Sequence, residues 1–222
     1  LTANRLTVKR VVLPDGAGYD VEGEGLELQG GLRPAPDEET KQAVARFARA
    51  AALANDAEVH ALDGTVQAQG DTVDVAFLVL AAKLGADHAA VLAAHPRIAD
   101  LPYEAMRTHS ASLNRTEAGA RISVKGAPEV VLGMCEGVDQ AGMREALKHM
   151  AGEGYRVIAL AEKQAPAREA LSPERLQGLT FLGFAGLIDP LRSEAPAAVV
   201  EARRAGVDVR MITGDHPDTA LA

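Results

Sequence analysis

The segment LTFLGFAGLID, residues 179–189, most narrowly limits how this chain can fold, because it is almost continuously apolar. A strand with one face in water alternates apolar and polar residues, whereas an unbroken run is expected of a strand covered on both faces. A helical pattern closed by Gly206, a β-type run at VDVRMIT and a helix start at GDHPDTALA follow it. This order predicts a parallel βαβ unit. Two strands and one crossover helix are too few for a domain, so we expect the chain to be part of a larger protein.

The preceding part of the chain, roughly residues 7–180, mixes strand and helix patterns and predicts an α+β unit. Its first two β-type segments flank the turn PDGAG, which predicts a hairpin. An apolar stripe over residues 73–84 predicts an amphipathic helix, which Thr72 can cap and Gly85 can end. The other elements expected here are helices over 38–54, 87–94, 128–136 and 140–151 and strands over 106–115, 120–124 and 156–163.

The charge balance argues against a nucleic-acid partner. The formal net charge is −8 at pH 7, whereas nucleic-acid binders normally carry a basic face. The single cysteine, Cys135, excludes an internal disulfide and is expected to be a small core residue rather than a nucleophile. No apolar stretch approaches the roughly 18 residues of a membrane-spanning helix, so we expect that this part of the protein does not contact a membrane.

The segment ISVKGAPEVV places a lysine where a strand passes into a helix. The β-type run ends at Lys125, Gly126 follows, and Pro128 suits the first helical position, with Glu129 in the first turn. A glycine beside a cation leaves room for another group to approach closely. Lys125 is therefore either a cation that faces a ligand or an ordinary surface lysine at a strand end.

Four motifs occur in the order KGAPE, GYRVIALA, GLIDPLR and MITGDHPDTA. With them the chain resembles the type II cation-transporting P-type ATPases, and the opening LTANRLTV is similar to the segment that follows the phosphorylated aspartate of that family. The resemblance implies an α+β nucleotide-binding (N) domain over residues 7–187, with an antiparallel sheet flanked by helices. This domain would be inserted into an incomplete α/β, haloacid-dehalogenase-like phosphorylation (P) domain, of which residues 1–6 and 188–222 would be parts.

The same resemblance implies a function for the whole protein. It would be an ATP-driven cation pump of the cell membrane, and the chain would be its cytoplasmic ATP-binding part. The pump would transfer the γ-phosphoryl group of ATP to an aspartate just upstream of Leu1, with Mg²⁺ neutralising charge. The partners of the chain would be ATP and the membrane and actuator domains of the same pump, and the chain alone is expected to be inactive.

The resemblance implies an ATP pocket formed by five residues: Asp74, Tyr103, Lys125, Gly126 and Arg156. Lys125 would reach toward the nucleotide as a mobile charge, and Gly126 would leave room for the ligand. Tyr103 would stack on adenine, where the family has phenylalanine. Asp74 stands where the family usually has glutamate and would accept from the adenine amino group or orient an arginine. Arg156 would bind phosphate or the Asp74 carboxylate.

The chain departs from the family pattern in the segment after Tyr103. Thr108 and Ser110 stand where the family often has a lysine and a methionine. The exchange at Thr108 removes one cation from the expected pocket.

Five further residues would support the phosphoryl site of the intact pump. Thr213, Gly214 and Asp215 match the Thr-Gly-Asp of the family, whose hydroxyl and backbone N–H groups would hold phosphoryl oxygens at a helix start. Asp189 and Arg192 match the Asp-Pro-x-Arg on the hinge side. The six histidines show no metal-ligand spacing, so no metal ligand is predicted in this chain.

Every one of these residues also has an ordinary structural explanation, such as a strand-end cation, a half-buried core tyrosine or an aspartate favoured by the helix dipole. Two other functions stay open. A phosphohydrolase of the haloacid-dehalogenase type would need a nucleophilic aspartate at the end of a strand before Leu1. A non-catalytic nucleotide-sensing or interaction module would need no catalytic residues at all.

Overall fold

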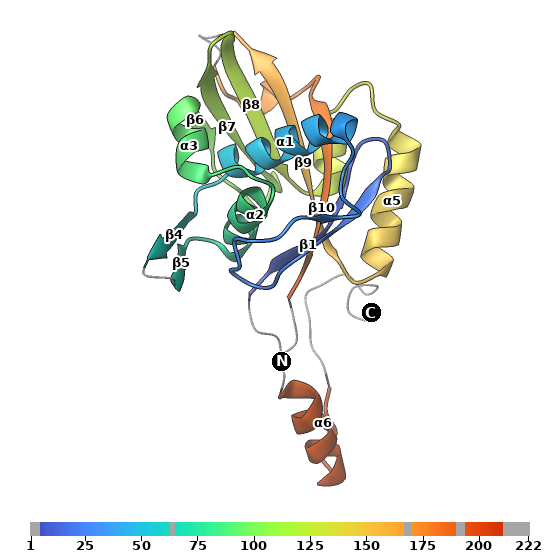
Figure 1. The fold of residues 1–222 in the computed structure, drawn as a ribbon. Coiled ribbons are helices and arrows are strands. Elements are labelled where there is room, and N and C mark those ends of the chain that lie inside the picture. Colours follow the sequence, from blue (N-terminus) through green and yellow to red (C-terminus); the bar gives the residue numbers. More distant parts are fainter. Residues whose placement is uncertain (1–4, 63–64, 167–169, 190–193, 211–222) are drawn as a thin grey trace.

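The computed structural model describes residues 5–62, 65–166, 170–189 and 194–210. Its centre is an eight-stranded sheet in which every neighbouring pair is antiparallel, in the order β3-β2-β1-β10-β9-β8-β7-β6 (Figure 1). Its strands are β1 (Thr7–Val12), β2 (Gly18–Val21), β3 (Leu32–Arg33), β6 (Arg97–Leu101), β7 (His109–Thr116), β8 (Gly119–Gly126), β9 (Arg156–Ala165) and β10 (Thr180–Ile188). A separate ribbon pairs β4 (Glu58–Leu62) with β5 (Thr65–Gln69).

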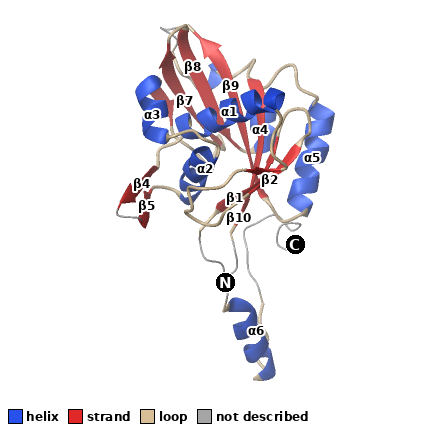
Figure 2. Cartoon of the chain, in the orientation of Figure 1, coloured by secondary structure: helices blue, strands red, loops and turns tan. Residues whose placement is uncertain are grey.

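Helices cover both faces of this sheet (Figure 2). Consecutive strand residues point to opposite faces, and on β9 Leu160 packs in the cluster that contains Phe47 and Phe77, whereas Ala159 packs with Val131 and Met150. One face therefore carries the helices that contain Phe47 and Phe77, and the other face carries the helices that contain Val131 and Met150. The helices are α1 (Glu38–Leu53), α2 (Thr72–Lys83), α3 (His88–Ala94), α4 (Pro128–Gly133), α5 (Gln140–Gly152) and α6 (Ala195–Arg204). The predicted antiparallel sheet flanked by helices is confirmed.

The direction of β10 corrects the expected parallel βαβ unit. This strand lies between β1 and β9 and runs antiparallel to both. Residues 181–187 are all buried, as expected of a strand covered on both faces. The lack of alternation thus indicated two covered faces correctly, but it carries no information about the direction of the neighbouring strands. Of the expected second strand, residues 207–210 are not in a strand, and 211–213 lie outside the described residues.

Aspartate side chains begin four of the helices. Asp37, Asp71, Asp87 and Asp139 each accept a hydrogen bond from a backbone N–H in the first turn of the following helix, which satisfies donors that have no partner within the helix. The cap of α2 is Asp71, and the expected cap, Thr72, is the first helical residue. The sequence pattern placed this start one residue late because Asp and Thr are both favourable caps.

The chain enters and leaves the sheet through neighbouring strands. Thr7 at the start of β1 pairs with Ile188 at the end of β10. Just beyond this pair, the backbone N–H of Arg5 donates to the Asp189 carboxylate at 3.2 Å. Helix α6 lies apart from the sheet, beyond this end of β1 and β10 (Figure 1). The segments that connect the sheet to the rest of the chain therefore lie side by side.

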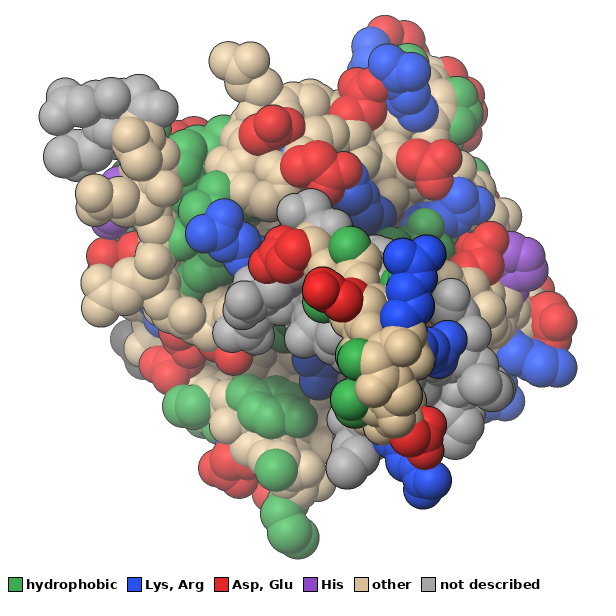
Figure 3. Space-filling view, turned by 90° about the horizontal axis from the view of Figure 1, so that it is seen from below, with side chains coloured by type: hydrophobic (Ala, Val, Ile, Leu, Met, Phe, Trp, Pro, Cys, Tyr) green, Lys and Arg blue, Asp and Glu red, His purple; other side chains and the backbone are tan. Residues whose placement is uncertain are grey.

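The surface shows no segregation of charge on the side from which α6 projects, where acidic and basic side chains are interspersed (Figure 3). Among the helices of the described residues, none is by itself long and apolar enough to cross a membrane. Helices α2 and α3 meet that criterion only when taken together, and they are bent by 88°.

Candidate functional site

A cavity of about 610 Å³ opens at one end of the sheet. Its wall combines the N-terminus of α2, the start of β7, the end of β8 with the start of α4, and the start of β9. The lining residues are Asp56, Asp71, Thr72, Val73, Asp74, Tyr103, Thr108, Ser110, Lys125, Gly126, Ala127, Pro128, Arg156, Val157 and Ile158. The fold thus brings together all five residues predicted for the ATP pocket, although they come from distant parts of the sequence.

Lys125 is a buried cation with a carboxylate partner. Its side chain is 6% exposed, and its ammonium forms an ion pair and hydrogen bond with Asp74. The ammonium also lies 5.2 Å from the centre of the Phe77 ring, within the range of a cation–π contact. Burial lowers the pKa of Lys125, and the charge of Asp74 opposes that shift. The mobile charge expected from the sequence is therefore a fixed one.

Asp74 is held from three directions in the first turn of α2. One carboxylate oxygen faces Lys125, and the other accepts from the backbone N–H of Asp56 at 3.1 Å. The side chain of Asn55 donates to the backbone carbonyl of Asp74 at 2.8 Å. These contacts connect the end of β8, the start of α2 and the segment after α1. Among the described residues no ion pair or hydrogen bond joins Asp74 to Arg156, so the expected orientation of that arginine by Asp74 is absent.

Tyr103 lies at the mouth of the cavity, between β6 and β7, with 62% of its surface exposed. The segment around it is folded back on itself, because Arg107 donates to the carbonyl of Pro102 at 2.7 Å and pairs with Glu104 at 3.0 Å. Thr108 has a φ of 56°, a left-handed conformation that is uncommon for residues other than glycine. The segment thus presents an open aromatic face beside the cavity.

Gly126 has a packing role that the sequence did not reveal. A Cβ at this position would lie 2.4 Å from the Cβ of His109 and 2.6 Å from the carbonyl oxygen of Thr108. Gly126 pairs with His109 across the β7–β8 ladder, so the neighbouring strand leaves no room for a side chain. Its place on the cavity wall is as expected, but the close approach that requires glycine is made by β7.

Arg156 begins β9 and is exposed at the rim of the cavity. Within the described residues it forms no ion pair or side-chain hydrogen bond, so its guanidinium is available to an anion. The sequence reasoning missed two carboxylates of the same wall, Asp56 and Asp71. Asp56 pairs with Arg97, and Asp71 caps α2. The signal for Asp71 was its position before Thr72, whereas nothing in the sequence pattern pointed to Asp56.

Of the five residues predicted to support the phosphoryl site, only Asp189 belongs to the residues that the structure describes. Asp189 accepts from the backbone of Arg5, and Arg192, Thr213, Gly214 and Asp215 lie outside the described residues. The described residues contain no group of three or more His, Cys, Asp or Glu that could hold a metal ion.

Cys135 is a core residue, as predicted. It is 7% exposed, and its thiol donates to the carbonyl of Val131 at 3.1 Å. Burial raises the pKa of the thiol to about 12. The nucleophilic thiolate form is thus strongly disfavoured at neutral pH.

Comparison with known proteins identifies the family. Residues 43–194 match the family described as "P-type ATPase, cytoplasmic domain N". The chain belongs to this P-type ATPase family. The resemblance to cation-transporting P-type ATPases found in the four motifs is thereby confirmed.

Curated relatives of this P-type ATPase domain match the whole chain. It is 33% identical over 242 residues to the cation-transporting ATPase pma1 of Synechocystis, covering 26% of that protein. It is 30% identical over 239 residues to a calcium-transporting ATPase of Bacillus subtilis, covering 27%. It is 31% identical over 242 residues to calcium-transporting ATPase type 2C member 2 of Homo sapiens, covering 24%. The chain therefore spans about a quarter of the length of these relatives.

Proposed function

We propose that the cavity beside Tyr103 and Lys125 binds ATP. The observation that carries this proposal is the convergence of Asp74, Tyr103, Lys125, Gly126 and Arg156 on one cavity. Its volume of about 610 Å³ falls within the range of roughly 300–1,000 Å³ that is usual for small-molecule sites.

Each of the side chains has a chemical role in this proposal. Tyr103 offers an exposed π face on which adenine can stack. Arg156 offers a guanidinium without an ion-pair partner among the described residues, and its planar fork suits phosphate oxygens. Lys125 supplies positive charge from the cavity wall, but Asp74 already neutralises much of it. Phosphate binding by this pocket therefore depends mainly on Arg156, and we expect modest affinity because solvent screens an exposed cation.

The intact protein would be an ATP-driven cation pump located in the cell membrane, with this chain on the cytoplasmic side. The names of the relatives support this assignment, since they are cation- or calcium-transporting ATPases. In such a pump ATP would be presented to an aspartate outside this sequence, which accepts the γ-phosphoryl group with Mg²⁺ bound to the phosphates. Asp189, Arg192, Thr213, Gly214 and Asp215 would hold the phosphoryl site.

The proposed division into residues 1–6, 7–187 and 188–222 follows from the same assignment. An inserted domain must enter and leave its host at nearby points. The pairing of Thr7 with Ile188 and the hydrogen bond from Arg5 to Asp189 supply this proximity. The host would be a haloacid-dehalogenase-like P domain, and the membrane and actuator domains would be the further partners.

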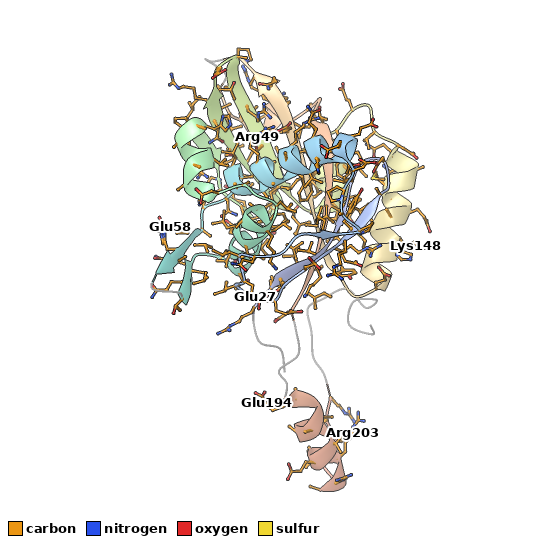
Figure 4. All side chains as sticks on the ribbon, in the orientation of Figure 1. Glu27, Arg49, Glu58, Lys148, Glu194 and Arg203 are labelled. Carbon is orange, nitrogen blue, oxygen red and sulfur yellow. The ribbon has the colours of Figure 1, made fainter. Side chains whose placement is uncertain are left out.

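An NMR titration of the 222-residue chain with ATP, with and without Mg²⁺, tests the binding proposal. We expect saturable shifts of the backbone signals of Tyr103, Lys125 and Arg156 at millimolar ATP, with little dependence on Mg²⁺. Lys148→Ala is the matched control, since Lys148 is exposed on α5, which packs on the other face of the sheet (Figure 4). We expect Lys148→Ala to bind ATP as the wild type does. An absence of shifts around the cavity, or loss of ATP binding in Lys148→Ala, would refute the proposal.

A further inference from the structure

A second cleft, of about 470 Å³, lies between α1 and the strands β8, β9 and β10. It is lined by Gln42, Ala45, Arg46, Arg49, Arg121, Glu162, Lys163, Gln164 and Thr180. Figure 4 shows Arg49 on α1, which crosses the sheet. On β9, Glu162 lies six residues beyond Arg156, which lines the other cavity. The strand register places Glu162 between Ser123 of β8 and Thr180 of β10. We name this site the arginine cleft.

Among the residues that the structure describes, Glu162 is the only carboxylate that lines the arginine cleft, and its side chain is 6% exposed. Its Oε1 accepts from Nε of Arg46 at 2.9 Å. Its Oε2 accepts from Nη1 of Arg121 at 2.8 Å and from Nη2 of Arg49 at 3.5 Å. A fourth cation, Lys163, donates to the backbone carbonyls of Arg175 and Gln177. The cleft therefore concentrates positive charge in a chain whose formal net charge is −8.

Arg49 has only a long contact with its carboxylate partner, Glu162. Its hydrogen bond to Glu162 is at the long limit, and its buried Nε has no acceptor among the described residues. The Nε of Arg121 is likewise buried without an acceptor. Desolvation lowers the pKa of Arg49, and the neighbouring charge of Arg121 adds to that shift. Buried N–H groups without an acceptor are costly, and both of these arginines line the cleft.

We propose that the arginine cleft binds a small phosphorylated anion. Guanidinium groups match phosphate oxygens with two parallel hydrogen bonds, and three of them converge here with Lys163 and the Thr180 hydroxyl beside them. None of the described residues that line the cleft is aromatic, so these residues offer no stacking surface for a base. This separates the arginine cleft chemically from the cavity beside Tyr103, and the proposal does not depend on ATP binding there.

A titration of the 222-residue chain with pyrophosphate tests the proposal, read from the arginine Nε–Hε signals in ¹H–¹⁵N NMR spectra. We expect saturable shifts at Arg46, Arg49 and Arg121. Arg49→Gln should weaken binding about tenfold, as expected for loss of a charge-assisted bond. Arg144→Gln on α5 is the matched control and should bind as the wild type does. Absence of saturable shifts, or unchanged affinity in Arg49→Gln, would overturn the proposal, and so would equal affinity for sulfate.

Glu162→Gln separates a ligand site from a purely structural clamp. Both models predict a less stable fold, because three guanidiniums lose their carboxylate. Only a ligand site predicts tighter pyrophosphate binding, since the glutamate no longer repels the anion. Pyrophosphate should then raise the melting temperature of Glu162→Gln more than that of the wild type. A variant that folds but gains no stabilisation from pyrophosphate would show that the arginines serve only to bind Glu162. Tyr103→Ala should leave pyrophosphate binding at this cleft unchanged.

Discussion

The ammonium of Lys125 is ion-paired with the carboxylate of Asp74, which joins the end of β8 to the first turn of α2. Both groups are largely removed from water, with side-chain exposures of 6% and 20%. The pair therefore holds α2 against the sheet. If the cavity binds ATP, the pair also sets how much positive charge the cavity wall presents to phosphate.

Lys125→Met should destabilise the fold by about 3–5 kcal/mol, because removal of one partner leaves a buried charge unpaired. The double variant Lys125→Met/Asp74→Leu should be less destabilised than Lys125→Met, because it leaves no buried charge behind. Urea unfolding of both variants and of Asp74→Leu completes a double-mutant cycle. Additive losses in this cycle would show that the two residues are not coupled and would contradict the ion pair.

Tyr103→Ala should weaken ATP binding by about 1 kcal/mol, roughly fivefold, because the exposed ring supplies the stacking surface. The fold should lose little stability, since 62% of Tyr103 is exposed. Tyr103→Phe keeps the ring and should bind ATP as the wild type does. Calorimetric titration of the three proteins measures the difference. Equal affinity in Tyr103→Ala would exclude stacking at this position.

The sequence predicted most of the elements and five residues of the cavity wall, but not their interactions. The pattern of apolar and polar residues reports on local burial, which is why β10 was correctly expected to be covered on both faces. Strand direction depends on which strands become neighbours, a long-range property. The apolar run of β10 was therefore assigned to a parallel unit, whereas the register with Val157 and Val11 is antiparallel.

The same limit applies to the cavity. Motifs identified Lys125 and Asp74, but a motif gives no distance, and the pair between them arises only when β8 meets α2. Asp56 was missed because it belongs to no motif and reaches the cavity through a backbone bond to Asp74. The arginine cleft was missed for a similar reason. Arg49, Arg121 and Glu162 lie far apart in sequence and in unrelated patterns.

Gly126→Ala should destabilise the fold by about 1–3 kcal/mol, the usual cost of overpacking. The added Cβ would lie 2.4 Å from the Cβ of His109, on a neighbouring strand that cannot move freely. Gly133→Ala is the matched control, because a Cβ at the end of α4 meets nothing within 4 Å. That exchange should be neutral or slightly stabilising. Thermal unfolding that shows equal effects for both would refute the packing role of Gly126.

Glu162 should make the fold sensitive to acid. Burial raises the pKa of Glu162, but the charge of Arg121 and hydrogen bonds from Arg46 and Arg121 outweigh burial, so the net shift of its pKa is downward. A group whose pKa is lower in the folded state contributes stability above its unfolded pKa, about 4.3 for glutamate, and loses it as the pH falls through the folded pKa. The free energy of unfolding should therefore fall on the acid side of this value.

Glu162→Gln isolates that contribution, because other carboxylates also respond to acid. The wild type should exceed the variant in unfolding free energy by a constant amount near neutral pH. The difference should shrink as the pH drops below about 4.3, where protonation removes the charge from Glu162. Urea unfolding of both proteins across this range measures the difference directly. A gap that stays constant into strong acid would mean that the arginines do not stabilise the Glu162 carboxylate.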